Sequence, residues 1–279
     1  WPETGNNAPV GLFYGGYANS TGGNTNVIDK ITIASTGDAV DFGDTVTVCN
    51  ELAGCGSSTR GVIGGGQSPN PSSGNTSDFG DLTVARRSLG SFSSSTRGVW
   101  GGGESGNKDT IDYVTISSAG NASDFGDLLA AQKEIGGMAS PTRGVFVGGD
   151  TSNVIQYVTI SSTGNASDFG DLSKTTGSRC GNVASNTRGV TYLGNGNSIE
   201  YITIGSTGNS TDFGDADASN KHGDGVSSNI LGLFIIGTYN VETTQFVTIA
   251  TTGNTTSSGD LTLARSKLGT NSNSHGGIA

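Results

Sequence analysis

The sequence contains few of the residues that build disulfide frameworks, histidine-based active sites or helices. Its 279 residues include 3 cysteines and 2 histidines, and runs of helix-forming residues are almost absent. Three cysteines are too few for a disulfide framework, and an odd number leaves at least one thiol free, so they do not fix the redox compartment. No apolar run approaches the length of a membrane span. We therefore expect a soluble protein with almost no helix and no membrane insertion.

Basic residues are also scarce. Lys and Arg number 14 against 24 Asp and Glu, which gives a formal net charge of −10. An acidic chain without a basic patch disfavours binding to the phosphates of nucleic acid or to an anionic membrane. The chain begins at Trp1 without a Met and carries no signal peptide, as a processed or truncated product would. We expect no nucleic-acid partner.

Glycine, in contrast, is abundant, with 48 residues, and it is regularly spaced. An apolar run that ends in glycine recurs at a period of roughly 45 residues, at 11–16, 61–66, 98–103, 144–149, 189–194 and 232–237. Such regularity excludes a disordered linker and indicates units that bury their apolar faces only against their neighbours. We expect one domain over residues 1–279, with repeats at about 10–59, 60–96, 97–142, 143–187, 188–230 and 231–275.

Each repeat has room for four short strands, which we call A to D. In the third copy these are 89–95 (A), 96–103 (B), 111–117 (C) and 123–128 (D). The A copies are all poor in bulky side chains, as expected for the innermost strand of blades arranged around an axis. The chain starts just before a B strand and ends just after an A strand, so Leu268 to Ser274 would pair with Val10 to Gly16 and close the ring. We predict an all-β fold of six four-stranded antiparallel blades, or seven if the chain is truncated.

The second repeat departs from this pattern. It passes from GVIGGGQSPNPSSGN directly to TSDFGDL, so one strand C with its flanks is missing. Either this blade has only three strands or residues are missing from the sequence. We favour the second alternative, because a lost strand would leave backbone N–H and C=O groups of its neighbours unpaired and would expose apolar faces.

The order of these elements resembles the kelch-type β-propeller repeat over about residues 8–279. The double glycines (for example Gly101 and Gly102) and the strand C tyrosines Tyr113, Tyr157 and Tyr201 match that pattern. The usual Trp of the outer strand is replaced by phenylalanines, which we expect to be buried between blades: Phe42, Phe79, Phe125, Phe169 and Phe213. The sequence TRGVWGGG followed by IDYVTISSAGNASDFGDL also looks like the kelch-like repeats of tail or fibre proteins from marine bacteriophages, especially those of cyanobacteria.

Three recurring motifs have both a functional and a structural interpretation. The DFGD segments would offer carboxylates for Ca²⁺, but an Asp that caps backbone N–H groups beside a Gly is the explanation we favour. The arginines Arg60, Arg97, Arg143 and Arg188 would meet an acidic ligand as a ring, but pairing with a neighbouring blade's Asp or carbonyls is the more common role. Five of six glycosylation-type sequons fall at one Gly-Asn turn, where turn chemistry explains them.

No catalytic constellation is visible, and we expect no enzyme activity, no cofactor and no metal site. The two histidines, His222 and His275, do not supply the ligand cluster of a copper oxidase or metallohydrolase. Cys180 lies in a small-residue strand without a group to orient His222 as its base.

The resemblance implies a non-enzymatic virion component. We expect a propeller on a phage tail or fibre that adheres to a host-surface glycan or to other virion proteins, with a homo-oligomer in the fibre as one form. The alternatives are a secreted, extracellular bacterial adhesion or carbohydrate-binding propeller and, third, an enzyme on a kelch scaffold. Because the B-to-C loops vary whereas the C-to-D turns hardly do, we expect binding on the B-to-C face, with Tyr17, Lys108 and Tyr239 as contacts. Uniform C-to-D turns that contact repeated partner subunits are the competing hypothesis.

Overall fold

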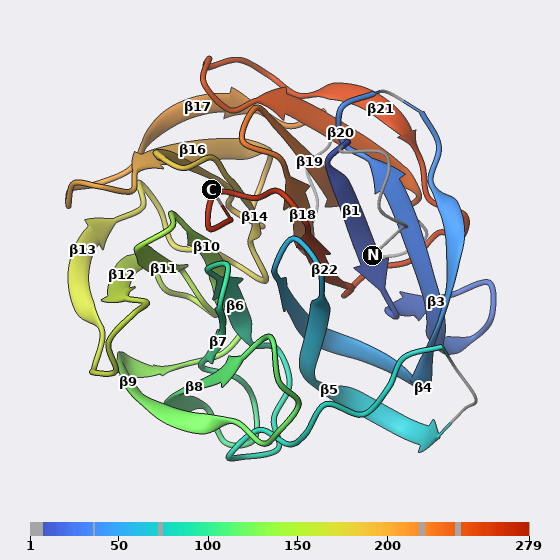
Figure 1. The fold of residues 1–279 in the computed structure, drawn as a ribbon. Helices are drawn as coiled ribbons and strands as arrows, with labels where there is room; N and C mark the ends of the chain where they lie inside the picture. The colour runs from blue at the N-terminus through green and yellow to red at the C-terminus, as the bar shows by residue number, and fades with distance from the viewer. Residues whose placement is uncertain (1–7, 36, 72–74, 218–220, 238–240, 279) are drawn as a thin grey trace.

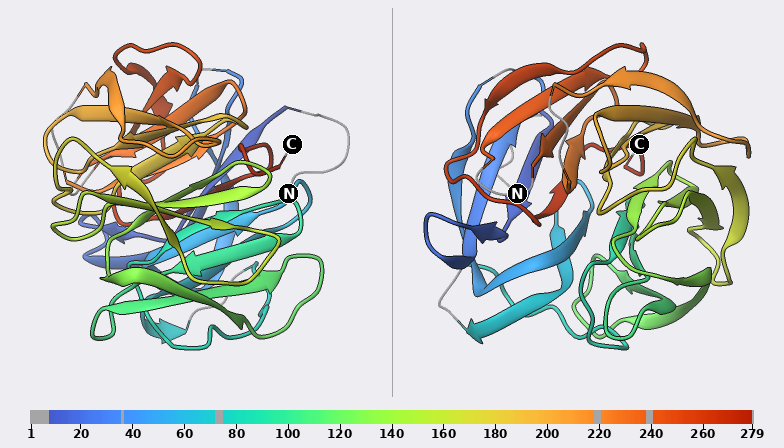
Figure 2. Two further views of the ribbon diagram at one scale, coloured as in Figure 1. Left: turned by 90° about the vertical axis from the view of Figure 1, so that its left-hand side faces the viewer. Right: turned by 180° about the vertical axis from the view of Figure 1, so that it is seen from behind.

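The computed structural model describes residues 8–35, 37–71, 75–217, 221–237 and 241–278, and within these ranges the fold is entirely β. Antiparallel strands are arranged around a common axis as a propeller (Figures 1 and 2). The prediction of an all-β propeller is therefore confirmed.

Four sheets have the predicted four-stranded blade order from the axis outward. They are β6 (Gly90–Ser93), β7 (Arg97–Gly101), β8 (Lys108–Thr115) and β9 (Ser123–Gln132); β10 (Gly136–Ala139), β11 (Arg143–Val147), β12 (Val154–Thr159) and β13 (Ser167–Asp171); β14 (Gly181–Ala184), β15 (Arg188–Tyr192), β16 (Ser198–Thr203) and β17 (Thr211–Asp215); and β18 (Gly223–Ser227), β19 (Leu231–Ile236), β20 (Thr243–Thr248) and β21 (Thr256–Asp260). Within each, consecutive strands pair, as the A-B-C-D repeat predicts.

The fifth sheet joins the two ends of the chain. Its order is β22 (Gly269–Ser272), β1 (Val10–Tyr14), β3 (Gly23–Thr32), β4 (Val40–Gly56) and β5 (Gly61–Pro71), and β2 (Tyr17–Ala18) pairs with β3. In the register of β1 and β22, Gly11 lies opposite Ser272 and Tyr14 opposite Gly269. The predicted pairing of the two terminal segments is therefore present.

The prediction of six blades is wrong, because the described strands form five sheets. The long strand β4 is strand D of the first repeat at its beginning and strand A of the second repeat at its end, and it carries both into one sheet. The second repeat adds only β5 to it, and the described residues between Pro71 and Gly90 form no strand. Closure is therefore partial, with the opening inside the second repeat rather than at a terminus.

Small residues pack where the inner strands converge. Each inner strand contacts the next one around the axis, in the order β4, β6, β10, β14, β18 and β22, and β22 contacts β4 in turn. A Cβ at Gly137 of β10 would come within 2.3 Å of the carbonyl oxygen of Ser91 in β6. This close approach of backbones explains why the innermost strands are rich in glycine and other small residues.

Larger apolar side chains fill the wedges between neighbouring sheets. Three of the outer-strand phenylalanines are buried as predicted, with exposed fractions of 2% for Phe125, 3% for Phe169 and 2% for Phe213. Phe125 packs against Val158 and Ile160 of the next repeat, and its ring meets Tyr113 edge-on at 5.8 Å. Each wedge thus needs a strand C from both of the repeats that form it.

Two phenylalanines depart from the prediction, and the missing strand explains both. Phe42 is 39% exposed, because the second repeat offers no strand C to cover it. Phe79 is only partly buried, against Trp100 and Val114 of the third repeat, because its own repeat supplies no tyrosine-bearing strand.

Candidate functional site

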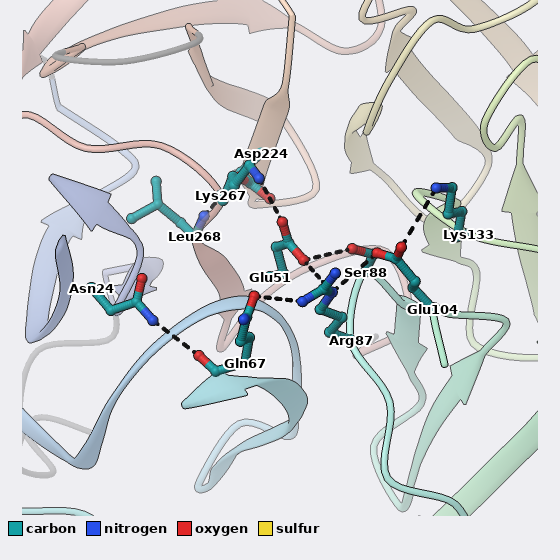
Figure 3. Close-up of polar contacts among 10 residues, drawn as sticks. All are labelled: Asn24, Glu51, Gln67, Arg87, Ser88, Glu104, Lys133, Asp224, Lys267 and Leu268. Atoms are coloured by element: carbon teal, nitrogen blue, oxygen red, sulfur yellow. Dashed lines mark hydrogen bonds and ion pairs between the residues drawn. The ribbon is translucent and has the colours of Figure 1, made fainter. Parts of the chain in front are cut away.

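The connections B-to-C and D-to-A lie on one face of the propeller, because consecutive strands are antiparallel. Charged side chains on this face form a chain of alternating sign, which we call the charged arc. Its members, in order, are Lys267, Glu51, Arg87, Glu104, Lys133 and Asp150, and Figure 3 draws all of them except Asp150.

Arg87 is at the centre of the charged arc. Its Nε lies 3.0 Å from Oε2 of Glu51 and 3.0 Å from Oε2 of Glu104, and its Nη1 donates to Oε1 of Gln67 at 2.5 Å. Lys267 Nζ donates to Glu51 Oε1 at 2.5 Å. The guanidinium of Arg87 therefore links the second repeat to the third.

The third and fourth repeats extend the charged arc more loosely. Lys133 Nζ lies 3.7 Å from Oε1 of Glu104 and 3.7 Å from Oδ2 of Asp150. Both carboxylates are substantially exposed, so these contacts contribute little to stability and leave oxygens accessible to a ligand.

The carboxyl groups of this face differ in their affinity for protons. Burial opposes ionisation of Glu51, but the hydrogen bond and charge of Lys267, with the charge of Arg87, hold its pKa below the ordinary value. The hydrogen bond from Arg87 likewise lowers the pKa of Glu104. Burial and the nearby charge of Asp150 raise the pKa of Glu134. The arc therefore keeps its two central glutamates ionised at neutral pH.

Backbone hydrogen bonds between repeats fix the residues beneath the arc. Glu51 N donates to Lys267 O at 2.9 Å, Ser88 N to Glu51 O at 2.8 Å, and Glu134 N to Ser88 O at 2.9 Å. All four residues have positive φ, between 55° and 58°. Non-glycine residues rarely adopt this conformation, and it gathers at sites where the surrounding structure holds the chain firmly.

Buried ion pairs support this face from below. Arg86 Nη1 lies 2.6 Å from Asp112 Oδ2 with both side chains fully buried, and Arg265 makes the equivalent contact with Asp29 at 2.8 Å. The related segments LTVARRSLG and LTLARSKLG carry the two arginines. Each pair fastens a D-to-A connection to strand C of the following blade.

The inner strands enclose a cavity of about 90 Å³ on the axis. Near its mouth Arg179 Nε lies 3.1 Å from Asp224 Oδ1, and Arg179 Nη2 donates to the carbonyl of Leu52 at 2.8 Å. Burial raises the pKa of Asp224 to about 6, against the opposing charge of Arg179. His275 closes the other end, where its Nε2 lies 3.0 Å from Ser93 Oγ.

Two of the three predicted contact residues lie beside the charged arc, and the third cannot be placed. Tyr17 N donates to Ser266 O at 2.8 Å, next to Lys267. Lys108 pairs with Gln132, next to Lys133. Tyr239 lies outside the described residues. Tyr17 and Lys108 come from different sheets, and no described contact joins them. In the sequence, the only sign of the charged arc was that its charged residues fall in the D-to-A and B-to-C connections.

On the opposite face, the recurring asparagines join neighbouring repeats. Asn121 Oδ1 accepts from Asp81 N at 3.1 Å, and the same contact recurs for Asn75 with Asp44, Asn165 with Asp127, Asn209 with Asp171 and Asn254 with Asp215. Within the DFGD turns, Asp41 and Asp78 accept from the N–H groups of Gly43 and Gly80. A Cβ at Gly126, whose φ is 144°, would meet Gly164 O at 2.5 Å. The capping interpretation of DFGD therefore holds at Asp41 and Asp78, whereas the copies at 124–127, 168–171 and 212–215 lie within the outer strands β9, β13 and β17.

The repeated arginines are structural. Arg97 Nη1 donates to Ile160 O of the next repeat at 2.9 Å, and Arg60, Arg143 and Arg188 make equivalent bonds to Ile116, Ile204 and Ile249. The guanidinium of Arg97 also stacks over Tyr113, at 4.6 Å from the ring centroid. Carbonyl pairing, one of the two structural roles expected, therefore occurs in all four repeats.

Cys180 and His222 do not form a reactive pair. Cys180 is buried, its pKa is raised to about 12 by burial, and its sulfur contacts the carbonyls of Ser178 and Leu193. A thiol with that pKa is not ionised at neutral pH. Within the described ranges, no three His, Cys, Asp or Glu side chains are grouped to hold a metal ion, and no helix has the length and hydropathy to cross a membrane.

Neither the protein-family models nor the curated proteins compared with this chain give a match.

Proposed function

We propose that this protein is a non-enzymatic virion component, a kelch-type propeller on a phage tail or fibre that adheres to a host-surface glycan or to another virion protein. The observation that carries the proposal is the contrast between the two faces. The C-to-D turns use their asparagines for bonds between repeats, whereas the B-to-C face carries loops of unequal length and the charged arc.

Sugars and polar protein surfaces suit this second face. Glu104 and Asp150 present partly exposed carboxylates, which accept hydrogen bonds from hydroxyl groups. Tyr17, which is also partly exposed, adds an aromatic ring of the kind that stacks on sugars. A secreted bacterial carbohydrate-binding propeller would use the same face. That alternative differs in where the protein acts, outside a bacterial cell instead of on a virion, and not in which face binds the ligand.

The test is binding of the purified protein to a glycan array and to host cells. We expect Tyr17→Ala combined with Lys108→Ala, or Glu104→Gln combined with Asp150→Asn, to weaken binding about tenfold or more, equivalent to roughly 1.4 kcal/mol. The matched control is Ser118→Ala combined with Thr163→Ala in the exposed C-to-D turns. If only the control variant loses binding, the ligand face is the uniform one.

A further inference from the structure

The second repeat contains an empty strand position. A cavity of about 490 Å³ lies between β5 and residues 79–82, where strand C would run, and Trp100 and Val114 of the third repeat line its far side. An engineered apolar cavity of about 150 Å³ is enough to hold benzene. This space, which we call the slot, therefore has room for several side chains.

The backbone beside the slot is an unused strand edge. In the third repeat β7 pairs with β6 on one side and with β8 on the other, whereas β5 pairs only with β4 among the described strands. Gly61, Val62 and Ile63 occupy the positions of Gly98, Val99 and Trp100. Unpaired strand edges are templates for pairing with another chain.

The missing strand also leaves an aromatic side chain of β4 exposed. Six large hydrophobic residues are exposed among the described residues, and three of them, Val40, Phe42 and Val46, lie on β4. A fourth, Val84, follows the segment that lines the slot. In the complete repeats a strand C covers the residue equivalent to Phe42, so the exposed ring of Phe42 marks a surface that the missing strand would bury.

Arg60 also lacks the aromatic partner of its counterparts. Arg97, Arg143 and Arg188 stack on the strand C tyrosine of their own repeat with the guanidinium 4.3 to 4.6 Å from the ring. Arg60 lies 5.9 Å from the ring of Phe79 instead. An aromatic side chain on an added strand would meet both the Arg60 cation and the edge of Phe79.

The described residues that flank 72–74 lie against β4 rather than in the slot. Pro71 pairs with Thr47, and Asn75 N donates to Asp44 O at 2.7 Å, so both ends of this connection lie against β4. The slot itself is continuous with the apolar interface between the second and third repeats, which includes Trp100, Val114 and Ala122.

We propose that the slot binds an extended segment of a partner protein, which adds as the missing strand between β5 and residues 79–82. Its side chains follow the pattern of the chain's own C strands, IDYVTI in the third repeat: apolar, polar, aromatic, apolar, Thr, apolar. The added strand pairs antiparallel with Gly61 to Gly64 and places its aromatic ring between Arg60 and Phe79. This inference does not depend on the proposed adhesion.

The test uses a synthetic peptide of residues 110–117, TIDYVTIS, with the full-length chain. The chain has 2 tryptophans, so in the Trp1→Phe variant fluorescence reports on Trp100, which lines the slot. We expect a saturable fluorescence change and slower hydrogen exchange at the amides of Gly61 and Ile63, which face the slot. A peptide N-methylated at its Val and second Ile, whose N–H groups face strand B in the register of β8 on β7, is expected to bind at least about tenfold more weakly, because it cannot complete the ladder.

Two protein variants form the matched control. Ile63→Lys places a charge at the slot and is expected to abolish peptide binding, whereas Ile230→Lys, at an exposed apolar residue remote from the slot, leaves it unchanged. Three results overturn the proposal: no saturable change, equal binding of the N-methylated peptide, or equal binding by Ile63→Lys. Self-association of the chain that the peptide displaces would also overturn it, because a second copy would then fill the slot.

Discussion

Asn165 of the fourth repeat accepts a hydrogen bond from the backbone N–H of Asp127 in the third repeat, with Oδ1 and N 3.1 Å apart. This bond joins the C-to-D turn of one repeat to the outer strand of the one before it. The asparagine that a sequence scan marks as a glycan acceptor is thus a connector between repeats.

Replacing Asn165 with Ala removes this bond. We expect the free energy of unfolding to fall by about 0.5–1.5 kcal/mol, the usual net value of one hydrogen bond. Chemical denaturation measures it, with Asn197→Ala, at an exposed loop asparagine, as the control. Equal stability of the two variants would show that the bond contributes nothing.

Phe125 and Phe42 occupy the same repeat position in different surroundings. Phe125→Ala should destabilise the fold by about 3–5 kcal/mol, because it leaves a cavity between two sheets. Phe42→Ala should cost less than about 1 kcal/mol, because that ring is already 39% exposed. Thermal and chemical denaturation of both variants compares them. Similar losses would contradict the role of the missing strand in uncovering Phe42.

The buried pair of Arg86 and Asp112 should be far more sensitive than the surface arc. Arg86→Met leaves Asp112 as a buried charge without its ion-pair partner, and we expect a loss of about 3–5 kcal/mol. Lys133→Met breaks two exposed contacts and should cost less than about 1 kcal/mol. The double variant Arg86→Met with Asp112→Leu should recover most of the loss, and failure to recover would point to the other bonds of Arg86.

His275 should make the stability of the chain depend on pH. Gly277 N donates to His275 Nδ1 at 3.0 Å, so the neutral ring carries its proton on Nε2, and burial lowers its pKa from 6.5 to about 4. The folded state therefore binds fewer protons than the unfolded state between these values. The resulting stability is complete above pH 6.5 and is lost as the pH falls towards 4.

Denaturation of the native protein and of His275→Gln, compared from pH 7.5 to pH 4, measures the contribution of His275 to the free energy of unfolding. The stability difference in favour of the native chain should shrink with acidification, while carboxylates common to both chains cancel. A difference that stays constant over this range would mean that His275 does not titrate in that way.

The sequence by itself determined the repeat, its strands and their order. Apolar alternation, double glycines and Gly-Asn turns are local signals, because a strand or turn depends on the few residues that compose it. The small residues of strand A also indicated the axis, since backbone crowding there favours small side chains. The pairing of the terminal strands followed from their position in the repeat.

Only the tertiary structure decided what the irregular second repeat does. The sequence showed that a strand was missing, but not that β4 would carry two repeats into one sheet or that a cavity would remain between β5 and Phe79. The charged arc was likewise hidden, because Glu51 and Lys267 are 216 residues apart and meet only when the ring brings their connections together. Local patterns fix the elements, whereas contacts between distant repeats depend on how the whole ring closes.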